Sequence, residues 1–140
     1  MAKRNCIMLI NANEDDNFLH EQVIKNSGLT ETILVTKLAT EALEYLKSKK
    51  EHPNAHPDLV FIDSNMPGMN SWKFLDEYSK LGKKFQCTAV IIMLTTSVNP
   101  DDKAKALSYN VSVGFKTKPL TEEMLEEIML KYFSIIKITV

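Results

Sequence analysis

Two short and wholly apolar runs constrain the fold of this chain more than any other feature of its sequence. Residues 59–62 read LVFI and residues 89–94 read AVIIML, and polar residues follow both runs. An apolar run of this length, bounded by turn formers, is typical of a strand that is buried on both faces. Such strands belong to parallel sheets that carry helices on both sides, so the sequence favours an α/β protein.

Three other segments predict further strands, and segments with helical spacing lie between and after them. Residues 6–10 form a compact apolar run, residues 32–36 are rich in β-branched side chains, and residues 111–115 are less apolar, which suits a sheet edge. Apolar residues recur at helical spacing in the other segments. The predicted buried stripes consist of Phe18, Leu19, Val23 and Ile24; Ala39, Ala42, Leu43 and Leu46; Phe74, Tyr78 and Leu81; and Leu125, Ile128, Met129 and Tyr132.

Helix start signals locate the remaining helix and predict where two of the other helices begin. Asn99 is a good N-cap, Pro100 suits the first helical position, and two acids follow them at the positive end of the helix dipole. The pair Asn70-Ser71 is predicted to cap the third helix, and Thr121 is predicted to cap the last one.

Five strands that alternate with five helices require parallel pairing and right-handed crossovers. The expected fold is a doubly wound five-stranded parallel sheet, because an eight-stranded barrel needs ~250 residues and this chain has 140. That length suits one hydrophobic core. We therefore expect a single domain over residues 1–140, with its core at 5–133 and an apolar tail at 134–140 that packs on the body or on a partner.

Composition argues against several classes of function. The formal net charge is −1, whereas a nucleic-acid footprint usually needs a strongly basic face. No stretch approaches the ~18 apolar residues of a transmembrane helix, and the N-terminus lacks a secretory signal. Neither a disulfide scaffold nor a metal site is predicted, because the chain has two cysteines and no acidic or cysteine cluster surrounds His20, His52 or His56. We expect a cytoplasmic protein that binds neither nucleic acid nor membrane.

Residues that could handle a phosphoryl group stand at the ends of three predicted strands. In a doubly wound sheet the carboxyl ends of the strands meet along one edge, which brings together Asp63, Thr95 and Lys118. A carboxylate can act as the nucleophile. A lysine ammonium can neutralise phosphoryl oxygens, and a hydroxyl can donate a hydrogen bond to one of them.

At these motifs the chain resembles a receiver domain of a two-component response regulator, over residues 5–133. The resemblance rests on PDLVFIDSNMPGMN around Asp63, IIMLTTS around Thr95 and FKTKPLT around Lys118. It implies a (βα)5 flavodoxin-like fold with strand order 2-1-3-4-5. It also implies that Asp63 accepts a phosphoryl group, that Thr95 and Lys118 sense it, and that Phe115 is the aromatic switch residue.

One departure from the family pattern concerns the metal. The family carries two acidic residues after strand one that hold Mg²⁺, and here Asn11 and Ala12 occupy those positions. By resemblance Asp63 and the backbone carbonyl of Asn65 are ligands, Asn11 offers one weak oxygen, and Ala12 cannot ligate. Mg²⁺ is usually held by one or two carboxylates plus waters. A unit-charge pair at ~4 Å is worth roughly 4 kcal/mol in an effective dielectric near 20, so we expect Mg²⁺ to bind weakly.

The acids that follow in the chain offer a possible replacement. Glu14, whose side chain is longer than those of Asp15 and Asp16, is the one that could swing back toward Asp63, although all three suit a helix start. Without acidic neighbours, Lys118 would have only Asp63 to pair with. We therefore hypothesise a metal-free ion pair between Asp63 and Lys118 in the resting state.

Two signalling hypotheses follow from the resemblance. The leading one is a stand-alone receiver, not an enzyme, that takes a phosphoryl group from a histidine kinase or phosphotransfer protein and signals through protein contacts. The family's usual contact face, formed by the fourth helix, the fifth strand and the fifth helix, would include Lys103, Ala106 and Phe115. The alternative is a pseudo-receiver that is not efficiently phosphorylated and acts as a constitutive interaction module. The kinase, the target, the signal and the oligomeric state, a homodimer included, stay open.

A third hypothesis, an enzyme on a similar sheet, lacks the groups that its chemistry requires. A phosphatase of the haloacid dehalogenase type needs a second aspartate where this chain has Asn65. A flavodoxin needs a phosphate-binding loop after strand one, and the acidic loop here would repel a flavin phosphate.

Overall fold

The computed structural model describes residues 6–48, 57–64, 66, 68–81, 89–96, 99–109 and 111–133. Within them, strands and helices alternate as β1 (Ile7–Ile10), α1 (Glu14–Ser27), β2 (Ile33–Thr36), α2 (Ala39–Ser48), β3 (Leu59–Asp63), α3 (Ser71–Leu81), β4 (Val90–Thr95), α4 (Pro100–Ala106), β5 (Val113–Thr117) and α5 (Glu122–Tyr132). The expectations for the carbonyl of Asn65 and for the tail at 134–140 lie outside the described residues.

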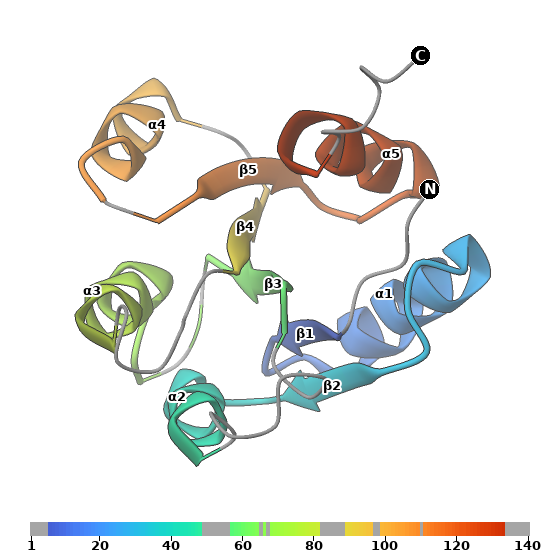
Figure 1. Cartoon of the computed structure of the whole chain (residues 1–140), viewed down its shortest axis with the longest axis horizontal. Coiled ribbons are helices and arrows are strands. Elements are labelled where there is room, and N and C mark those ends of the chain that lie inside the picture. The colour runs from blue at the N-terminus through green and yellow to red at the C-terminus, as the bar shows by residue number, and fades with distance from the viewer. Residues whose placement is uncertain are drawn as a thin grey trace.

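The five strands form one parallel sheet in the order β2-β1-β3-β4-β5, which confirms the predicted fold (Figure 1). The least apolar strand, β5, lies at one edge, where one row of backbone groups needs no partner strand. No helix in the described residues has both the length and the apolar composition needed to cross a membrane.

The helices divide between the two faces of the sheet, with α1 and α5 on one face and α2, α3 and α4 on the other (Figure 1). Side chains alternate between the faces along a strand. In β3, Val60 and Ile62 pack in the cluster with α2 and α3, whereas Leu59 and Phe61 pack in the cluster with α1 and α5. Asp63 continues the second series, so it stands on the side of the sheet that α1 covers.

The predicted start signals are confirmed by the side-chain contacts that cap the helices. The side chain of Asn99 accepts a hydrogen bond from the backbone N–H of Asp101 at 2.7 Å, and Thr121 accepts one from Met124 at 3.2 Å. Asn70 accepts one from Lys73 at 2.9 Å. These contacts satisfy N–H groups that the first turn of a helix leaves without intrahelical partners.

Two predictions for individual elements were wrong. The fifth strand was expected at 111–115 but runs from Val113 to Thr117, because its pairing with β4 continues to the partners Thr95 and Thr117. Apolarity falls off before the strand ends because an edge strand tolerates polar side chains near solvent. The expected stripe of α1 was also wrong at its start, since Phe18 is 62% exposed and Leu19 is 55% exposed.

The inward face of α1 is polar for a physical reason. Its buried residues are Asn17, His20 and Ile24, so the first half of the helix turns polar side chains toward the protein. That half of α1 lies at the carboxyl edge of the sheet, where Asp63 and other polar groups replace the apolar core as its packing surface.

Candidate functional site

The carboxyl edge of the sheet brings Asp63 and Lys118 together, as the sequence predicted. Asp63 is the last residue of β3 and is 7% exposed, and Lys118 follows directly after β5. The Nζ of Lys118 lies 3.0 Å from Oδ2 of Asp63. Lys118 is fixed through its backbone as well, because its N–H donates to the carbonyl of Thr95 at 2.9 Å. The hypothesised ion pair is therefore present.

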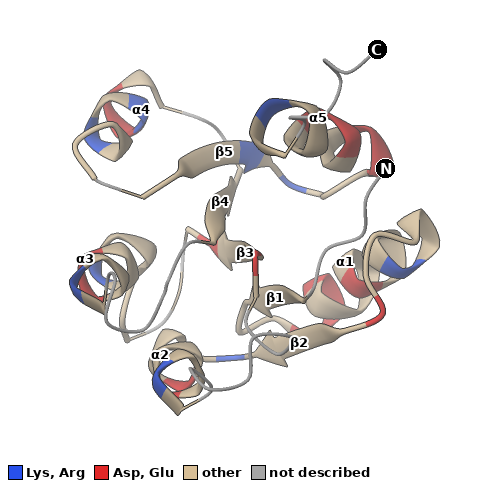
Figure 2. Ribbon diagram, in the orientation of Figure 1, with Lys and Arg blue, Asp and Glu red and all other residues tan. Residues whose placement is uncertain are grey.

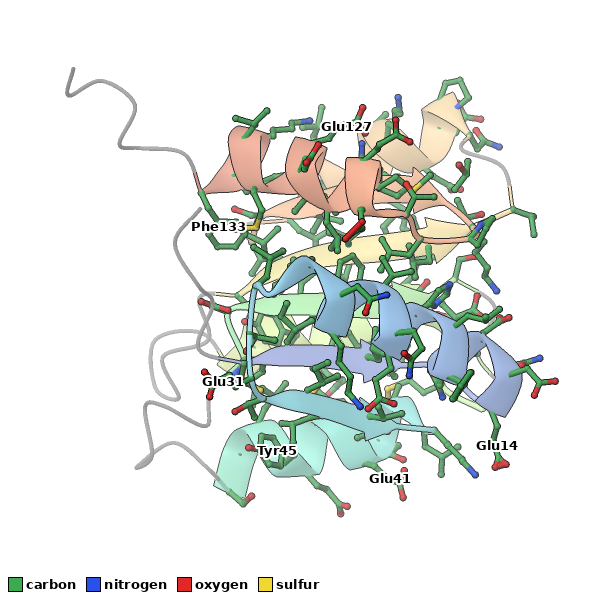
Figure 3. All side chains as sticks on the ribbon, turned by 90° about the vertical axis from the view of Figure 1, so that its right-hand side faces the viewer. Glu14, Glu31, Glu41, Tyr45, Glu127 and Phe133 are labelled. Carbon is green, nitrogen blue, oxygen red and sulfur yellow. The ribbon has the colours of Figure 1, made fainter. Side chains whose placement is uncertain are left out.

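A second carboxylate shares the same ammonium group, so the expectation that Lys118 would have only Asp63 to pair with was wrong. Oδ2 of Asp16, in the first turn of α1, lies 3.4 Å from Nζ of Lys118. The same oxygen accepts a hydrogen bond from Nδ2 of Asn11 at 3.3 Å. Glu14 does not swing toward the site: it pairs with Lys37 at 3.1 Å and points away from the body (Figure 3).

Asn11 does not offer its side-chain oxygen to a cation. Its Oδ1 accepts a hydrogen bond from the backbone N–H of Asn13 at 3.0 Å, and its Nδ2 group faces Asp16. Its backbone carbonyl accepts a hydrogen bond from Nδ2 of Asn17 at 2.8 Å. Asn11 is 4% exposed, so these contacts hold the amide in a fixed orientation. At this position the chain presents N–H donors where a divalent cation needs oxygens.

The described residues consequently fit a divalent cation poorly. Both carboxylates of the site are paired with Lys118, and Ala12 contributes only a methyl group. No cluster of three or more histidine, cysteine or acidic side chains suited to a metal occurs in the described ranges. In this arrangement the lysine ammonium supplies the positive charge between the two carboxylates.

Electrostatics around Lys118 favour its charged form. Burial lowers the pKa of its ammonium group, but the hydrogen bonds and negative charges of Asp63 and then Asp16 outweigh burial and raise the pKa above its ordinary value of 10.5. A raised pKa in the folded state means that the pairing stabilises the protein fully below pH 10.5. This contribution is lost as the pH rises through the folded-state value.

Replacing Asp16 by asparagine tests this second contact. Asp16→Asn is expected to lower the free energy of unfolding by about 1 kcal/mol, below the usual ~1.5–3 kcal/mol for a charged hydrogen bond because both side chains keep some solvent contact. The deficit should be constant near neutral pH and shrink as the pH rises through the pKa of Lys118. Urea unfolding in a pH series measures it, with Asp15→Asn as the matched control. A deficit of the same size at strongly alkaline pH would contradict the pairing.

The buried polar side chains of α1 were not predicted from the sequence. His20 is 2% exposed, and its pKa is lowered by burial, with the charges of Asp16, Lys118 and Asp63 as smaller influences. These influences place His20 within electrostatic range of the site. Its position four residues after Asp16, on the same helical face, was the available signal. Asn17 is buried beside it, and its Oδ1 has no hydrogen-bond partner among the described residues.

Of the other two predicted site residues, Thr95 lies at the same edge and Phe115 lies within β5. Thr95 is the last residue of β4, next to β5, and is partly buried. Phe115 lies in the middle of β5, and its ring centroid is 6.3 Å from that of Trp72 in α3. Trp72 in turn stacks on Tyr109 at 6.0 Å. Phe115 thus touches an aromatic group that reaches from α3 to the end of α4.

Polar contacts hold this group of aromatic side chains in place. The hydroxyl of Tyr109 donates to Oδ1 of Asp76 at 2.7 Å, and Nζ of Lys105 lies 4.4 Å from the centre of the Trp72 ring. Burial, with the hydrogen bond and charge of Asp76, raises the pKa of Tyr109 to about 12, so the hydroxyl stays a donor at neutral pH. Tyr109, in the segment after α4, therefore contacts α3 through both its ring and its hydroxyl.

The fold and the site together define a class. A doubly wound sheet in the order β2-β1-β3-β4-β5 with a carboxylate, a lysine and a threonine at its carboxyl edge is the arrangement of a flavodoxin-like signalling receiver. The family model of the response regulator receiver domain matches residues 7–130. The chain belongs to this family, which makes it a receiver domain of two-component signalling.

Similar sequences carry consistent names. Response regulator Rcp1 of Synechocystis sp. is 26% identical over 107 residues, which cover 76% of this chain and 71% of that protein. The probable methanogenesis regulatory protein FilR2 of Methanothrix harundinacea is 27% identical over 120 residues, which cover 86% of this chain and 76% of that protein.

Solved structures agree with the fold. A two-component response regulator from Cytophaga hutchinsonii superposes with a TM-score of 0.81 at 27% identity, covering 92% of this chain and 96% of that one. The phosphorylated cyanobacterial phytochrome response regulator RcpA gives 0.68 at 26% identity, covering 91% and 89%. The Mn²⁺-bound form of response regulator Rcp1 gives 0.70 at 22% identity, covering 94% and 96%, and bears on the fold alone.

Proposed function

We propose that this receiver domain accepts a phosphoryl group on Asp63 from a histidine kinase or a phosphotransfer protein in a cytoplasmic phosphorelay. The observation that carries the proposal is the contact of 3.0 Å between Lys118 and the buried carboxylate of Asp63. A carboxylate can act as the nucleophile that forms an acyl phosphate, and a fixed cation beside it can stabilise the charge that develops during the transfer. The related RcpA has been solved in a phosphorylated form, which adds support.

The transfer itself is a displacement at phosphorus. An oxygen of the Asp63 carboxylate forms the new P–O bond, the bond between phosphorus and the donor's imidazole nitrogen breaks, and its electron pair stays on that nitrogen. Lys118 is placed to neutralise phosphoryl oxygens as the charge moves onto Asp63. Thr95, at the end of the neighbouring strand, can donate a hydrogen bond from its hydroxyl to one of the same oxygens.

Phosphorylation would then change the conformation of residues in and next to β5. If Thr95 and Lys118 move toward the new charge, the equilibrium between two arrangements of their neighbours shifts. Phe115 is the proposed switch residue, since it lies three positions before Lys118 and contacts Trp72. The proposed output surface is the face of α4, β5 and α5 that binds the downstream protein.

The metal that the family uses has a reduced role in this proposal. The carboxylates of Asp63 and Asp16 already pair with the ammonium group of Lys118, and the side-chain amide of Asn11 donates a hydrogen bond to Asp16. Mg²⁺ is therefore expected to bind weakly.

A second candidate function has a specific observation in its favour. Lys118 is shared between Asp63 and Asp16, and its contact with Asp16 opposes movement of the ammonium group with a phosphoryl group on Asp63. A domain that stays in this state is a pseudo-receiver, which acts as a constitutive protein-interaction module without efficient phosphorylation. The two functions share the fold and the output surface and differ only in the reactivity of Asp63.

Acetyl phosphate separates the two candidates. The full chain is incubated with acetyl phosphate and Mg²⁺, and its intact mass is measured before and after. We expect a gain of one phosphoryl group that is absent in Asp63→Asn and retained in Asp101→Asn, a matched change in an exposed acid of α4. No gain in any variant would overturn the phosphoacceptor role and support the pseudo-receiver.

A further inference from the structure

Lys118 is held at both ends of its side chain, and both contacts keep its ammonium group beside Asp63. Its backbone N–H donates to the carbonyl of Thr95 at 2.9 Å. Its Nζ donates to Oδ2 of Asp63 at 3.0 Å and to Oδ2 of Asp16 at 3.4 Å. Figure 2 shows acidic segments at the end of β3 and in the first turn of α1, and a basic segment directly after β5. Because a lysine side chain is flexible, the second carboxylate reduces the number of positions that the ammonium group can take.

The carboxylate of Asp16 is itself held by its neighbours. Its backbone N–H donates to the capping side chain of Asn13 at 2.9 Å, and its Oδ2 accepts a hydrogen bond from Nδ2 of Asn11 at 3.3 Å. Asn11 is oriented in turn, because its Oδ1 accepts from the N–H of Asn13 and its carbonyl accepts from Nδ2 of Asn17. The start of α1 and the end of β1 thus form one hydrogen-bonded unit around Asp16.

The amide at position 11 and the carboxylate at position 16 depend on each other. A carboxylate in place of the Asn11 amide would face Asp16 across the present contact of 3.3 Å, and two like charges at that distance oppose each other's ionisation. Residue 11 follows Ile10, the sheet partner of Ile62, so residues 11 and 63 lie side by side at the carboxyl edge. The second acid of the site therefore stands at position 16, where it holds a lysine, and an amide donor stands at position 11.

An ammonium group held in this way can stabilise a phosphoryl group without moving. Two of its three N–H groups contact carboxylates, which leaves the third for a phosphoryl oxygen. Fixed charges and donors stabilise the charge that develops during a transfer, since they need no reorganisation in that step. The side chain of Lys118 is 23% exposed, so a phosphoryl donor can approach it from solvent.

We propose that Asp16 is a positioning residue for phosphoryl transfer: through Lys118 it fixes a positive charge beside Asp63, and this allows Asp63 to accept a phosphoryl group without a divalent cation. The proposal rests on the phosphoacceptor role proposed above and adds which groups of this chain replace the metal. Its ground is the set of donors, because both carboxylates are paired with one lysine and the side chain at position 11 presents N–H groups.

With acetyl phosphate as the donor, the step needs no other reactant. An oxygen of the Asp63 carboxylate forms a bond to phosphorus, the bond between phosphorus and the acetate oxygen breaks, and acetate leaves with the electron pair. No proton is transferred, and the total charge is unchanged. Lys118 stays paired with Asp16 and donates its third N–H to the phosphoryl group.

Acetyl phosphate labelling of the full chain, with intact mass measured against time, tests the proposal. Each protein is labelled once with a chelator and once with excess Mg²⁺, and the initial rates are compared. For the parent we expect equal rates within the error of the measurement. Asp16→Asn should slow labelling in the chelator by at least about tenfold, and Asp16→Glu should recover most of that loss. Asp15→Asn, a change of an exposed acid in the same helical turn, should match the parent.

An exchange of the two side chains separates positioning from folding. Asn11→Asp combined with Asp16→Asn keeps the number of charges but moves the carboxylate from α1 to the end of β1. This protein should label slowly in the chelator and at least about tenfold faster with Mg²⁺, because a second carboxylate directly beside Asp63 suits a divalent cation. Loss of structure would lower both rates equally, so the ratio of the two rates reports on the position of the charge.

Three outcomes contradict the proposal in different ways. Labelling of the parent that requires Mg²⁺ would overturn it and leave the phosphoacceptor role intact. Labelling of Asp16→Asn in the chelator at the rate of the parent would overturn it as well, because Asp16 would then have no part in the transfer. No labelling of any protein, with or without Mg²⁺, would overturn the phosphoacceptor role and the metal-free step together. The failure of this proposal and the failure of the proposed function are therefore distinguishable.

Discussion

Replacing Ala12 by aspartate is expected to tighten the binding of Mn²⁺ or Mg²⁺ by about 10–100-fold. Ala12 is exposed at the carboxyl edge of the sheet, next to the buried Asn11, so a carboxylate there has room and water. A unit-charge pair at ~4 Å is worth roughly 4 kcal/mol at an effective dielectric of 20. Discounting roughly 30–65% of this for screening leaves about 1.4–2.8 kcal/mol, which is one to two powers of ten in affinity.

The measurement is a titration of Mn²⁺ in which the free ion is followed by electron paramagnetic resonance. Asn26→Asp, an exposed position in the second half of α1, is the matched control for the added charge, and its affinity should equal that of the parent. Equal affinities in all three proteins would show that the missing acid is not what weakens the site. Tight binding by the parent itself would refute the poor fit of its donor set.

The fold could be predicted from the sequence because each element carries its own local signal. The runs at 59–62 and 89–94 are short, apolar and followed by polar residues, which is typical of strands covered on both faces. Caps such as Asn99 and Thr121 act through neighbouring residues, so their contacts were predictable as well. The error in β5 arose because the end of an edge strand is set by pairing with its neighbour, not by its own apolarity.

The site was predictable only where topology alone fixes it. Asp63 and Lys118 meet because parallel strands deliver their carboxyl ends to one edge, whatever the side chains between them are. The role of Asp16 depends on the rotation of α1 about its axis. The apolar pattern gave the wrong rotation, because Phe18 and Leu19 face solvent while Asn17 and His20 face the site. A helix that covers a polar site buries polar residues, so the periodicity of apolar residues does not identify its inner face there.

Replacing Lys118 by methionine is expected to have the second large effect, because it leaves two carboxylates without their common cation. Removing one partner of a fully buried pair costs about 3–5 kcal/mol. Since 23% of the Lys118 side chain is exposed, we expect a smaller loss in the free energy of unfolding, about 2 kcal/mol. Methionine keeps most of the length of the lysine side chain, so the loss reports on charge more than on packing.

The same variant should acquire a dependence on Mg²⁺ that the parent lacks. Asp63 and Asp16 would then face each other without an ammonium group, which gives an added cation the position that Lys118 holds in the parent. Mg²⁺ at ten times its dissociation constant would restore about 1.4 kcal/mol. Urea unfolding with and without Mg²⁺ measures both effects. Lys116→Met, which breaks the more exposed pair with Glu127, is the control. Its free energy of unfolding should fall by less than ~1 kcal/mol and should not respond to Mg²⁺. If Mg²⁺ stabilised the parent and Lys118→Met equally, the lysine would not be the cation of this site.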